Sequence, residues 1–155
     1  FKAMLDTVRI TAARVADRQN SGFEDRRRSG AGTYLTPADI ARRGAIFTSD
    51  IFRQLRGIHL GYDYDTLATD TSPDTPPELI DSADRRILMR GITGNWCLPA
   101  MYLDGVYMPE FNADALDGWV HPERIAGIEV YSEVSVPPEY QRPRSGCGAI
   151  VIWTK

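Results

Sequence analysis

The sequence has few of the residues from which catalytic and metal sites are built, and no segment that predicts membrane insertion. Its 155 residues include two histidines and two cysteines, none of which are paired at metal-ligand spacing. No apolar run is long enough to cross a bilayer, and the N-terminus does not resemble a signal peptide. The net charge of −3 gives no general attraction to nucleic acid. We therefore expect no cofactor, no nucleic-acid partner, no transmembrane segment and no metal site formed by His59, Cys97, His121 and Cys147.

Catalytic signals are equally sparse, because no nucleophile stands with a base and no pair of acids is marked out. We expect a protein that is not an enzyme, with a small hydrolase as the least supported class. A calcium loop counted from Asp63 also fails. Its sixth position is Ala68 and its twelfth is Asp74, where an EF-hand needs Gly and Glu.

Charge is distributed unevenly along the chain. Residues 1–60 carry eleven basic and six acidic side chains, whereas residues 61–84 carry seven acids and no base. The second region also has three prolines and no hydrophobic periodicity, so we expect an acidic, solvated loop inside one domain that spans 1–155. A loop of this length in a compact domain is either mobile or held by a partner.

Residues 100–108 give the clearest secondary-structure signal. Two short segments of apolar and aromatic residues flank the dipeptide Asp104-Gly105. A type I′ turn needs positive φ at both central positions, which Gly adopts freely and Asp tolerates. The sequence therefore predicts a β-hairpin. Because a lone hairpin is marginal in water, we expect strands at 127–131 and 149–153 to join it in one sheet.

Two short helices are predicted before this hairpin. The first has Thr36 as its N-cap, Pro37 at its first position, Asp39 three residues after the cap, and Gly44 at its end. The second begins at Thr48-Ser49-Asp50 and ends at Gly57. Further helical turns are expected at 22–30, 114–119 and 121–126, and extended segments at 33–35 and 86–90.

These segments predict an α/β (α+β) fold in which a small mixed β-sheet carries two short helices on one face, with long loops between elements. Arg26, Arg27 and Arg28 fall short of a polybasic cluster, and we expect them on a solvated helix face. The expected core consists of Val8, Ile10, Ile40, Ile51, Leu55, Leu88, Tyr102, Leu103, Val106, Ile128, Val130, Ile150 and Ile152.

Five segments stand in a recognisable order along the chain: Thr36–Ile40, Ile87–Gly91, Tyr102–Val106, Ile125–Val130 and Gly148–Ile152. In this order they resemble the plug domain of TonB-dependent outer-membrane receptors. The resemblance implies a small α/β domain that is seated inside a large β-barrel and acts by gating. The sequence ends at Lys155, where the barrel strands of the family would begin. We therefore expect a plug-like domain that has no barrel of its own.

The resemblance also implies a role for a segment near the N-terminus. This segment is similar to the family's TonB box, a strand that is offered to the periplasmic protein TonB by edge addition. Its alternating side chains equally support a second interpretation, in which it is simply the first strand of the sheet. The residues concerned are Asp6, Thr7, Val8, Arg9, Ile10, Thr11 and Ala12.

Cys97 and Cys147 would be neighbours in a plug-type sheet, because they stand next to the hairpin and the last strand. In an oxidising periplasm, a disulfide is favoured over two buried thiols. Closure of a loop of this size stabilises a fold by roughly 3–4.5 kcal/mol in the chain-entropy model.

The function that we expect is that of a non-enzymatic, periplasmic, plug-like interaction module that resembles the gating domain of these receptors. Its partners would be a membrane β-barrel or a TonB-like protein. Alternatively, the plug-like fold is reused as a structural or adaptor subunit that docks on a larger membrane protein complex. Both interpretations make the chain membrane-associated through its protein partners.

Overall fold

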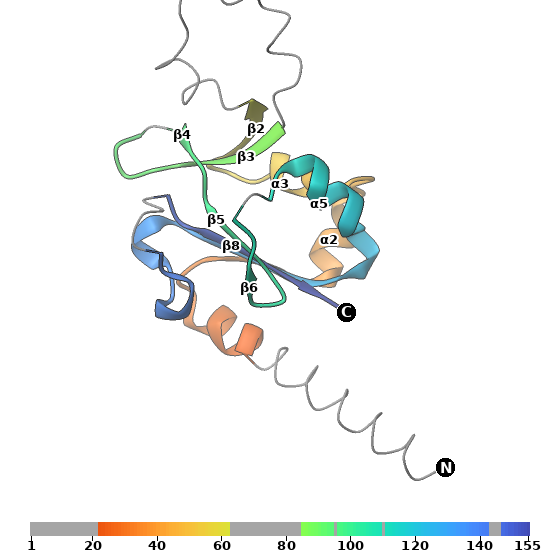
Figure 1. The fold of residues 1–155 in the computed structure, drawn as a ribbon. Coiled ribbons are helices and arrows are strands. Elements are labelled where there is room, and N and C mark those ends of the chain that lie inside the picture. Colours follow the sequence, from red (N-terminus) through yellow and green to blue (C-terminus); the bar gives the residue numbers. More distant parts are fainter. Residues whose placement is uncertain (1–21, 63–84, 95, 110, 143–146) are drawn as a thin grey trace, which may run out of the picture.

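The computed structural model describes residues 22–62, 85–94, 96–109, 111–142 and 147–155 (Figure 1). The TonB-box-like segment 6–12, the core candidates Val8 and Ile10, and the acidic region from residue 63 to residue 84 lie outside these ranges. The fold class expected from the sequence is confirmed: strands and short helices combine in an α+β arrangement with a mixed sheet.

The main sheet contains five strands in the order β1-β7-β8-β5-β6. Strands β5 and β8 run parallel, and the other neighbours run antiparallel. The central strands β7 and β8 are almost continuously apolar, as expected for strands that are buried on both faces. The bounds are β1 Thr33–Leu35, β5 Ala100–Leu103, β6 Val106–Tyr107, β7 Ile125–Tyr131 and β8 Ala149–Thr154.

The hairpin of β5 and β6 has the predicted turn. Asp104 and Gly105 have φ values of 50° and 81°, and Leu103 pairs with Val106 across the turn. The Asp104 carboxylate also accepts hydrogen bonds from the backbone N–H of Thr154 at 2.8 Å and from its hydroxyl at 2.7 Å. The turn residue therefore fixes the end of β8 as well as the hairpin.

A second, three-stranded antiparallel sheet was not predicted. It consists of β2 Ile58–Tyr62, β3 Arg85–Arg90 and β4 Trp96–Cys97, in the order β2-β3-β4. The strand expected at 86–90 is confirmed as β3, but it belongs to this sheet. The loop was expected to begin at residue 61, whereas Gly61 and Tyr62 continue β2. This strand is defined by its pairing with β3, which lies far away in the sequence.

Helix α2, Pro37–Arg43, is the helix that the sequence predicts best. The Asp39 N–H donates to the Thr36 hydroxyl at 3.3 Å, and the Thr36 N–H donates to the Asp39 carboxylate at 2.9 Å. These reciprocal bonds form a capping box, and Gly44 ends the helix with φ of 61°.

Helix α3, Thr48–Arg53, begins where the sequence predicts and ends earlier than predicted. Its N-cap is Phe47, and the Thr48 hydroxyl donates to the Val120 carbonyl. The N-terminal N–H of Ser49 donates to the Asp117 carboxylate at 2.7 Å. The helix ends at Arg53, with Gln54 as its C-cap, before the expected Gly57. Contacts with distant residues therefore satisfy part of its first turn.

The main sheet is covered on both faces (Figure 1). One face packs against α2, α3, the second sheet and α5, Ala113–Trp119, through side chains such as Ile128, Ile150 and Ile152. The opposite face carries Tyr102, Tyr131 and Val151, together with the short helix of residues 22–29 and the one-turn helices η3, Glu133–Ser135, and η4, Pro138–Tyr140. The sheet therefore forms the middle layer.

Most of the expected core side chains within the described ranges are buried, with three differences. Leu55 and Leu103 are half-buried. Val106 was predicted in the core and is 63% exposed. It lies on the edge strand β6 directly after the turn, where its side chain points to the same face of the sheet as its partner Leu103 but remains exposed. The prediction for Val106 is therefore wrong.

Candidate interaction surface

The two cysteines form a disulfide, Cys97–Cys147, which was the pairing favoured from the sequence. Cys97 ends β4, and Cys147 stands two residues before β8, so the bond joins the second sheet to the main sheet. The Cys147 side chain is fully buried. This crosslink holds the layers in one arrangement.

Both cysteines are bonded to each other, and the two histidines belong to different parts of the fold. His59 is exposed on β2, where its ring lies 5.5 Å from that of Trp96. His121 is exposed just before η2, Pro122–Arg124. Within the ranges that the structure describes, no three His, Cys, Asp or Glu side chains are grouped as metal ligands. No helix in those ranges has both the length and the apolarity to cross a membrane.

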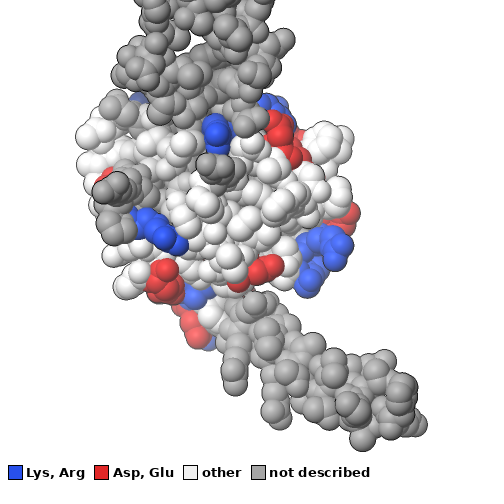
Figure 2. All heavy atoms as spheres, viewed as in Figure 1, with Lys and Arg blue, Asp and Glu red and all other residues white. Residues whose placement is uncertain are grey.

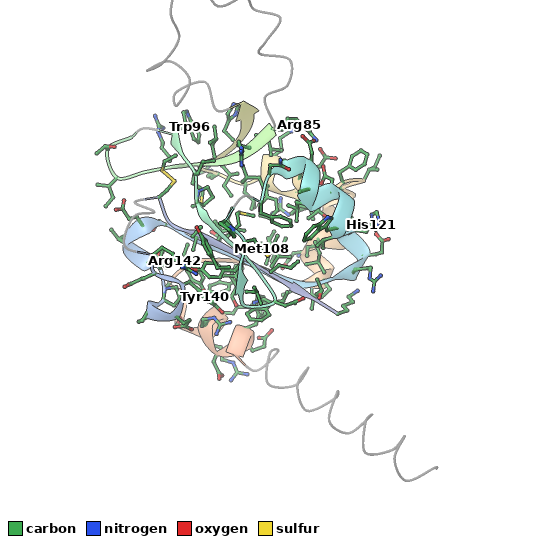
Figure 3. All side chains as sticks on the ribbon, viewed as in Figure 1. Arg85, Trp96, Met108, His121, Tyr140 and Arg142 are labelled. Atoms are coloured by element: carbon green, nitrogen blue, oxygen red, sulfur yellow. A yellow bond between two sulfur atoms is a disulfide. The ribbon has the colours of Figure 1, made fainter. Side chains whose placement is uncertain are left out.

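A largely uncharged surface lies beside the β5–β6 hairpin, although Arg86 lines its hollow and Arg142 is exposed at its side. Figure 2 shows this face, with charged side chains mainly toward its margin. Val106 and Leu98 are 63% and 42% exposed, and the face surrounds a small hollow of about 30 Å³. Met108 lies near its middle (Figure 3). We give the name hairpin face to Leu98, Tyr107, Met108 and Pro109, which line the hollow, together with the exposed Val106 of the same hairpin.

The hairpin face is held in position by a polar network beneath it. The Arg142 guanidinium lies 3.7 Å from the centroid of the Tyr107 ring, and its Nε donates to the Tyr102 hydroxyl at 3.3 Å. That hydroxyl in turn donates to the Tyr140 carbonyl at 3.0 Å. Figure 3 shows Arg142 and Tyr140 beside the hairpin. The face is therefore a preformed surface.

The hairpin face also includes a sheet edge. Among the strands that the structure describes, none pairs with the outer side of β6. Such an edge presents backbone donors and acceptors to a partner strand. Apolar side chains and a strand edge thus occur together at the hairpin.

A second exposed apolar group lies where α3 meets α5. Ile46, Phe47 and Trp119 are 79%, 54% and 66% exposed. They stand next to the hydrogen bond between Thr48 and Val120, which brings the two segments together. We call these three side chains the Trp119 patch.

A buried ion pair, which was not predicted from the sequence, lies on the face of the main sheet that carries Tyr102 and Tyr131. Glu129 is fully buried on β7, and its carboxylate binds Arg26 through two guanidinium nitrogens. Arg26 Nε lies 3.2 Å from Oε1 and 3.0 Å from Oε2, and Nη2 lies 2.7 Å from Oε1. The Tyr131 hydroxyl donates to Oε2 at 2.7 Å, and Trp153 Nε1 donates to Oε1 at 3.1 Å. We call this arrangement the Glu129 site.

The electrostatics of the Glu129 site keep its donors protonated. Burial lowers the pKa of Arg26, but the hydrogen bonds and charge of Glu129 outweigh that effect and raise the pKa above its ordinary value. Burial raises the pKa of Tyr131, and its hydrogen bond to Glu129 raises it further. The expectation that Arg26 lies on a solvated helix face is therefore wrong. A sequence signal did exist, because Glu129 is one carboxylate within an otherwise apolar strand.

With this geometry described, the fold can be assigned to a class. It is the plug-like fold found as one region of TonB-dependent siderophore receptors. A crystal structure of a G324V mutant of the ferric enterobactin receptor PfeA from Pseudomonas aeruginosa matches 81% of this chain and 17% of the receptor, with 19% identity and a TM-score of 0.52. The siderophore receptor PirA from Acinetobacter baumannii matches 81% of this chain and 17% of its own, with 18% identity and a TM-score of 0.53.

At this level of identity, the similarity establishes the fold and does not extend to ligands, partners or activity. The chain spans about a sixth of the length of each receptor. No model of a known protein family matches the chain, and no curated protein matches it.

Proposed function

We propose that the chain is a non-enzymatic, plug-like interaction module that acts in the periplasm. It associates with the outer membrane through a protein partner, and its role resembles that of the gating domain of TonB-dependent receptors. The plug-like fold supports the class, and the hairpin face supports the mode of action.

The observation that carries this proposal is the exposure of apolar side chains at a preformed sheet edge. Val106 extends from the hairpin and Leu98 from the segment just before it, and a disulfide, a cation–π contact and buried hydrogen bonds hold this region in place. Apolar side chains that stay exposed together are typical of a contact with another macromolecule. Because the surface is preorganised, it loses little conformational entropy on binding.

The TonB-box-like segment 6–12 supplies the second part of the proposal. In this account it offers an extended strand to a TonB-like protein, while the hairpin face docks on a membrane β-barrel. The two contacts involve different parts of the chain. They can therefore be tested separately.

The non-enzymatic part of the proposal is supported by the roles of the perturbed groups. Arg26, Asp39, Tyr131 and Tyr140 have shifted pKa values. Asp39 caps a helix, and Arg26 and Tyr131 satisfy a buried carboxylate. None of these four side chains lines the hollow at the hairpin face.

A second candidate function is favoured by the Trp119 patch. An adaptor subunit needs more than one contact, and this patch adds exposed apolar side chains to those of the hairpin face. In this version the plug-like fold docks on a larger membrane protein complex and makes no contact with a TonB-like protein.

The experiment that tests the proposal compares two variants, in each of which an exposed valine is replaced by glutamate. Val106 is on the hairpin face, whereas Val134, 81% exposed, is in η3 and provides a matched control. We expect V106E to abolish co-purification of the native partner and V134E to leave it intact. Equal retention of the partner by both variants would exclude the hairpin face as the contact.

The TonB contact is tested by deletion of residues 6–12. We expect the deletion to abolish binding to the C-terminal domain of TonB in a pull-down. The partner whose co-purification depends on Val106 should stay bound. If the full chain does not bind TonB but still co-purifies with a membrane complex at fixed stoichiometry, the adaptor function replaces the gating function.

A further inference from the structure

Arg26 occupies a site shaped for a guanidinium group, not merely for a positive charge. Two of its nitrogens point at the two oxygens of one buried carboxylate, which is the planar fork geometry specific to arginine. Its Cζ lies 5.6 Å from the centroid of the Tyr140 ring and 5.8 Å from that of Trp153. Glu139 adds a second carboxylate oxygen at 3.7 Å from Nη1. A lysine ammonium could not use all of these contacts together.

The helix that carries Arg26 is attached through few side chains. Phe23, 5% exposed, lies over Gly127, where an added Cβ would come within 2.9 Å of the ring. Arg26 follows three residues later on the same side of the helix. The side chains of Asp25, Arg27 and other residues of this segment are exposed. In the described part of this helix, Phe23 is the buried side chain and Arg26 makes the bonds to Glu129, so these two residues carry its attachment to the sheet.

The carboxylate site is built largely without Arg26. Tyr131 and Trp153 each donate a hydrogen bond to Glu129, and both belong to the central strands β7 and β8. These donors hold the carboxylate in one orientation, but they leave its negative charge unneutralised. A buried carboxylate surrounded by aromatic rings attracts a cation. The cation that fits best also donates hydrogen bonds to the carboxylate oxygens.

We infer that Glu129, Tyr131, Tyr140 and Trp153 form a recognition site for an arginine side chain. Arg26 fills this site in cis, and an arginine of another polypeptide can fill it in its place. A polypeptide is favoured over a small guanidine compound, because an aromatic residue three positions before the arginine would also enter the notch over Gly127. This site shares Tyr140 with the network beneath the hairpin face but none of the residues that define that face, and it does not depend on the proposed function.

The test uses the full chain with Arg26→Ala and the soluble probe ethylguanidinium. We expect the melting temperature to fall by about 10 °C, since the variant leaves a buried charge unpaired. Ethylguanidinium at about ten times its dissociation constant should then raise the melting temperature by about 4 °C. Ethylammonium at the same concentration should not. Equal effects of the two cations, or no effect of either, would overturn the inference.

Two further variants are controls. Arg27→Ala removes an exposed arginine of the same helix, whose partner is the exposed Glu24, and should respond to neither probe. The double variant R26A/E129Q should lose the response to ethylguanidinium, because the carboxylate is gone. If Arg26→Ala does not fold alone, the fraction that refolds in ethylguanidinium, followed by circular dichroism, becomes the measurement. No recovery over ethylammonium would again contradict the site.

A peptide experiment distinguishes an arginine of a polypeptide from a small guanidine compound as the occupant of the site. A labelled peptide copying residues 22–29 should bind the Arg26→Ala variant more tightly than ethylguanidinium does. The same peptide with lysine in place of its Arg26 should not bind. If the arginine peptide binds no tighter than ethylguanidinium, the polypeptide occupant is excluded.

Discussion

At the scale of single residues, the sequence predicts features that follow from the residue type itself. It misses features that depend on a partner far away in the sequence. The turn at Asp104 and Gly105 was predictable because its backbone conformation restricts the residues that fit. The burial of Arg26 was not, because its partner Glu129 is 103 positions away. Val106 was misplaced for the converse reason, since an apolar residue type does not reveal that its strand lies at a sheet edge.

Gly127 gives a prediction at this scale. A Cβ at this position would lie 2.9 Å from the Phe23 ring, so Gly127→Ala must displace the helix of residues 22–29. We expect a loss of about 1–3 kcal/mol in the free energy of unfolding, measured by urea denaturation. Gly118→Ala is the matched control, because no atom lies within 4 Å of its added Cβ, and the change should be neutral or stabilising in α5. Equal effects of the two substitutions would contradict the packing of Phe23.

The buried tyrosines give a pH dependence. Burial raises the pKa of Tyr140 to about 12, above its ordinary value near 10. Between these values the unfolded chain has lost the proton that the folded chain keeps, so stability falls as pH rises. Below pH of about 10 the contribution is complete. We expect urea denaturation to show a decline from pH 10 upwards that is smaller in Tyr140→Phe. An identical decline in both proteins would exclude this tyrosine.

At the scale of elements, local signals succeeded where the stabilising contacts are local. Helix α2 has its capping box and its terminal glycine within nine residues, Thr36 to Gly44. Helix α3 begins at Thr48, as predicted, but the N–H of Ser49 donates to Asp117, 68 positions away, a partner that no local pattern indicates. Strand β2 was missed because its pairing with β3 crosses the acidic region. The hairpin face was only partly foreseen, since its turn was predicted but the exposure of its side chains was not.

The disulfide gives a prediction about elements. It closes a loop with a sequence separation of 50 and joins β4 to the segment before β8. In the chain-entropy model, its reduction lowers the free energy of unfolding by about 4 kcal/mol. We expect dithiothreitol to lower the melting temperature, and amide exchange to accelerate first in the second sheet. Unchanged melting after complete reduction, confirmed by thiol titration, would show that the bond does not stabilise the arrangement of the two sheets.

At the scale of the whole molecule, the plug-like fold explains how a small chain can be both well packed and apolar on its surface. The main sheet is buried on both faces, so its core does not depend on a partner. The apolar side chains that stay exposed at the hairpin are therefore available for docking. The sequence was sufficient to predict the order of the segments, and hence the class of fold. It was insufficient for the surface, which depends on how the layers meet.

The central claim is that the hairpin face contacts a protein of the outer membrane. The most direct measurement is photo-crosslinking in living cells, with a photoreactive amino acid at Val106 and, as control, at Val134. The account predicts a crosslink from Val106 to one outer-membrane protein, identified by mass spectrometry, and none from Val134. Absence of a crosslink at Val106, or the same products from both positions, would contradict it.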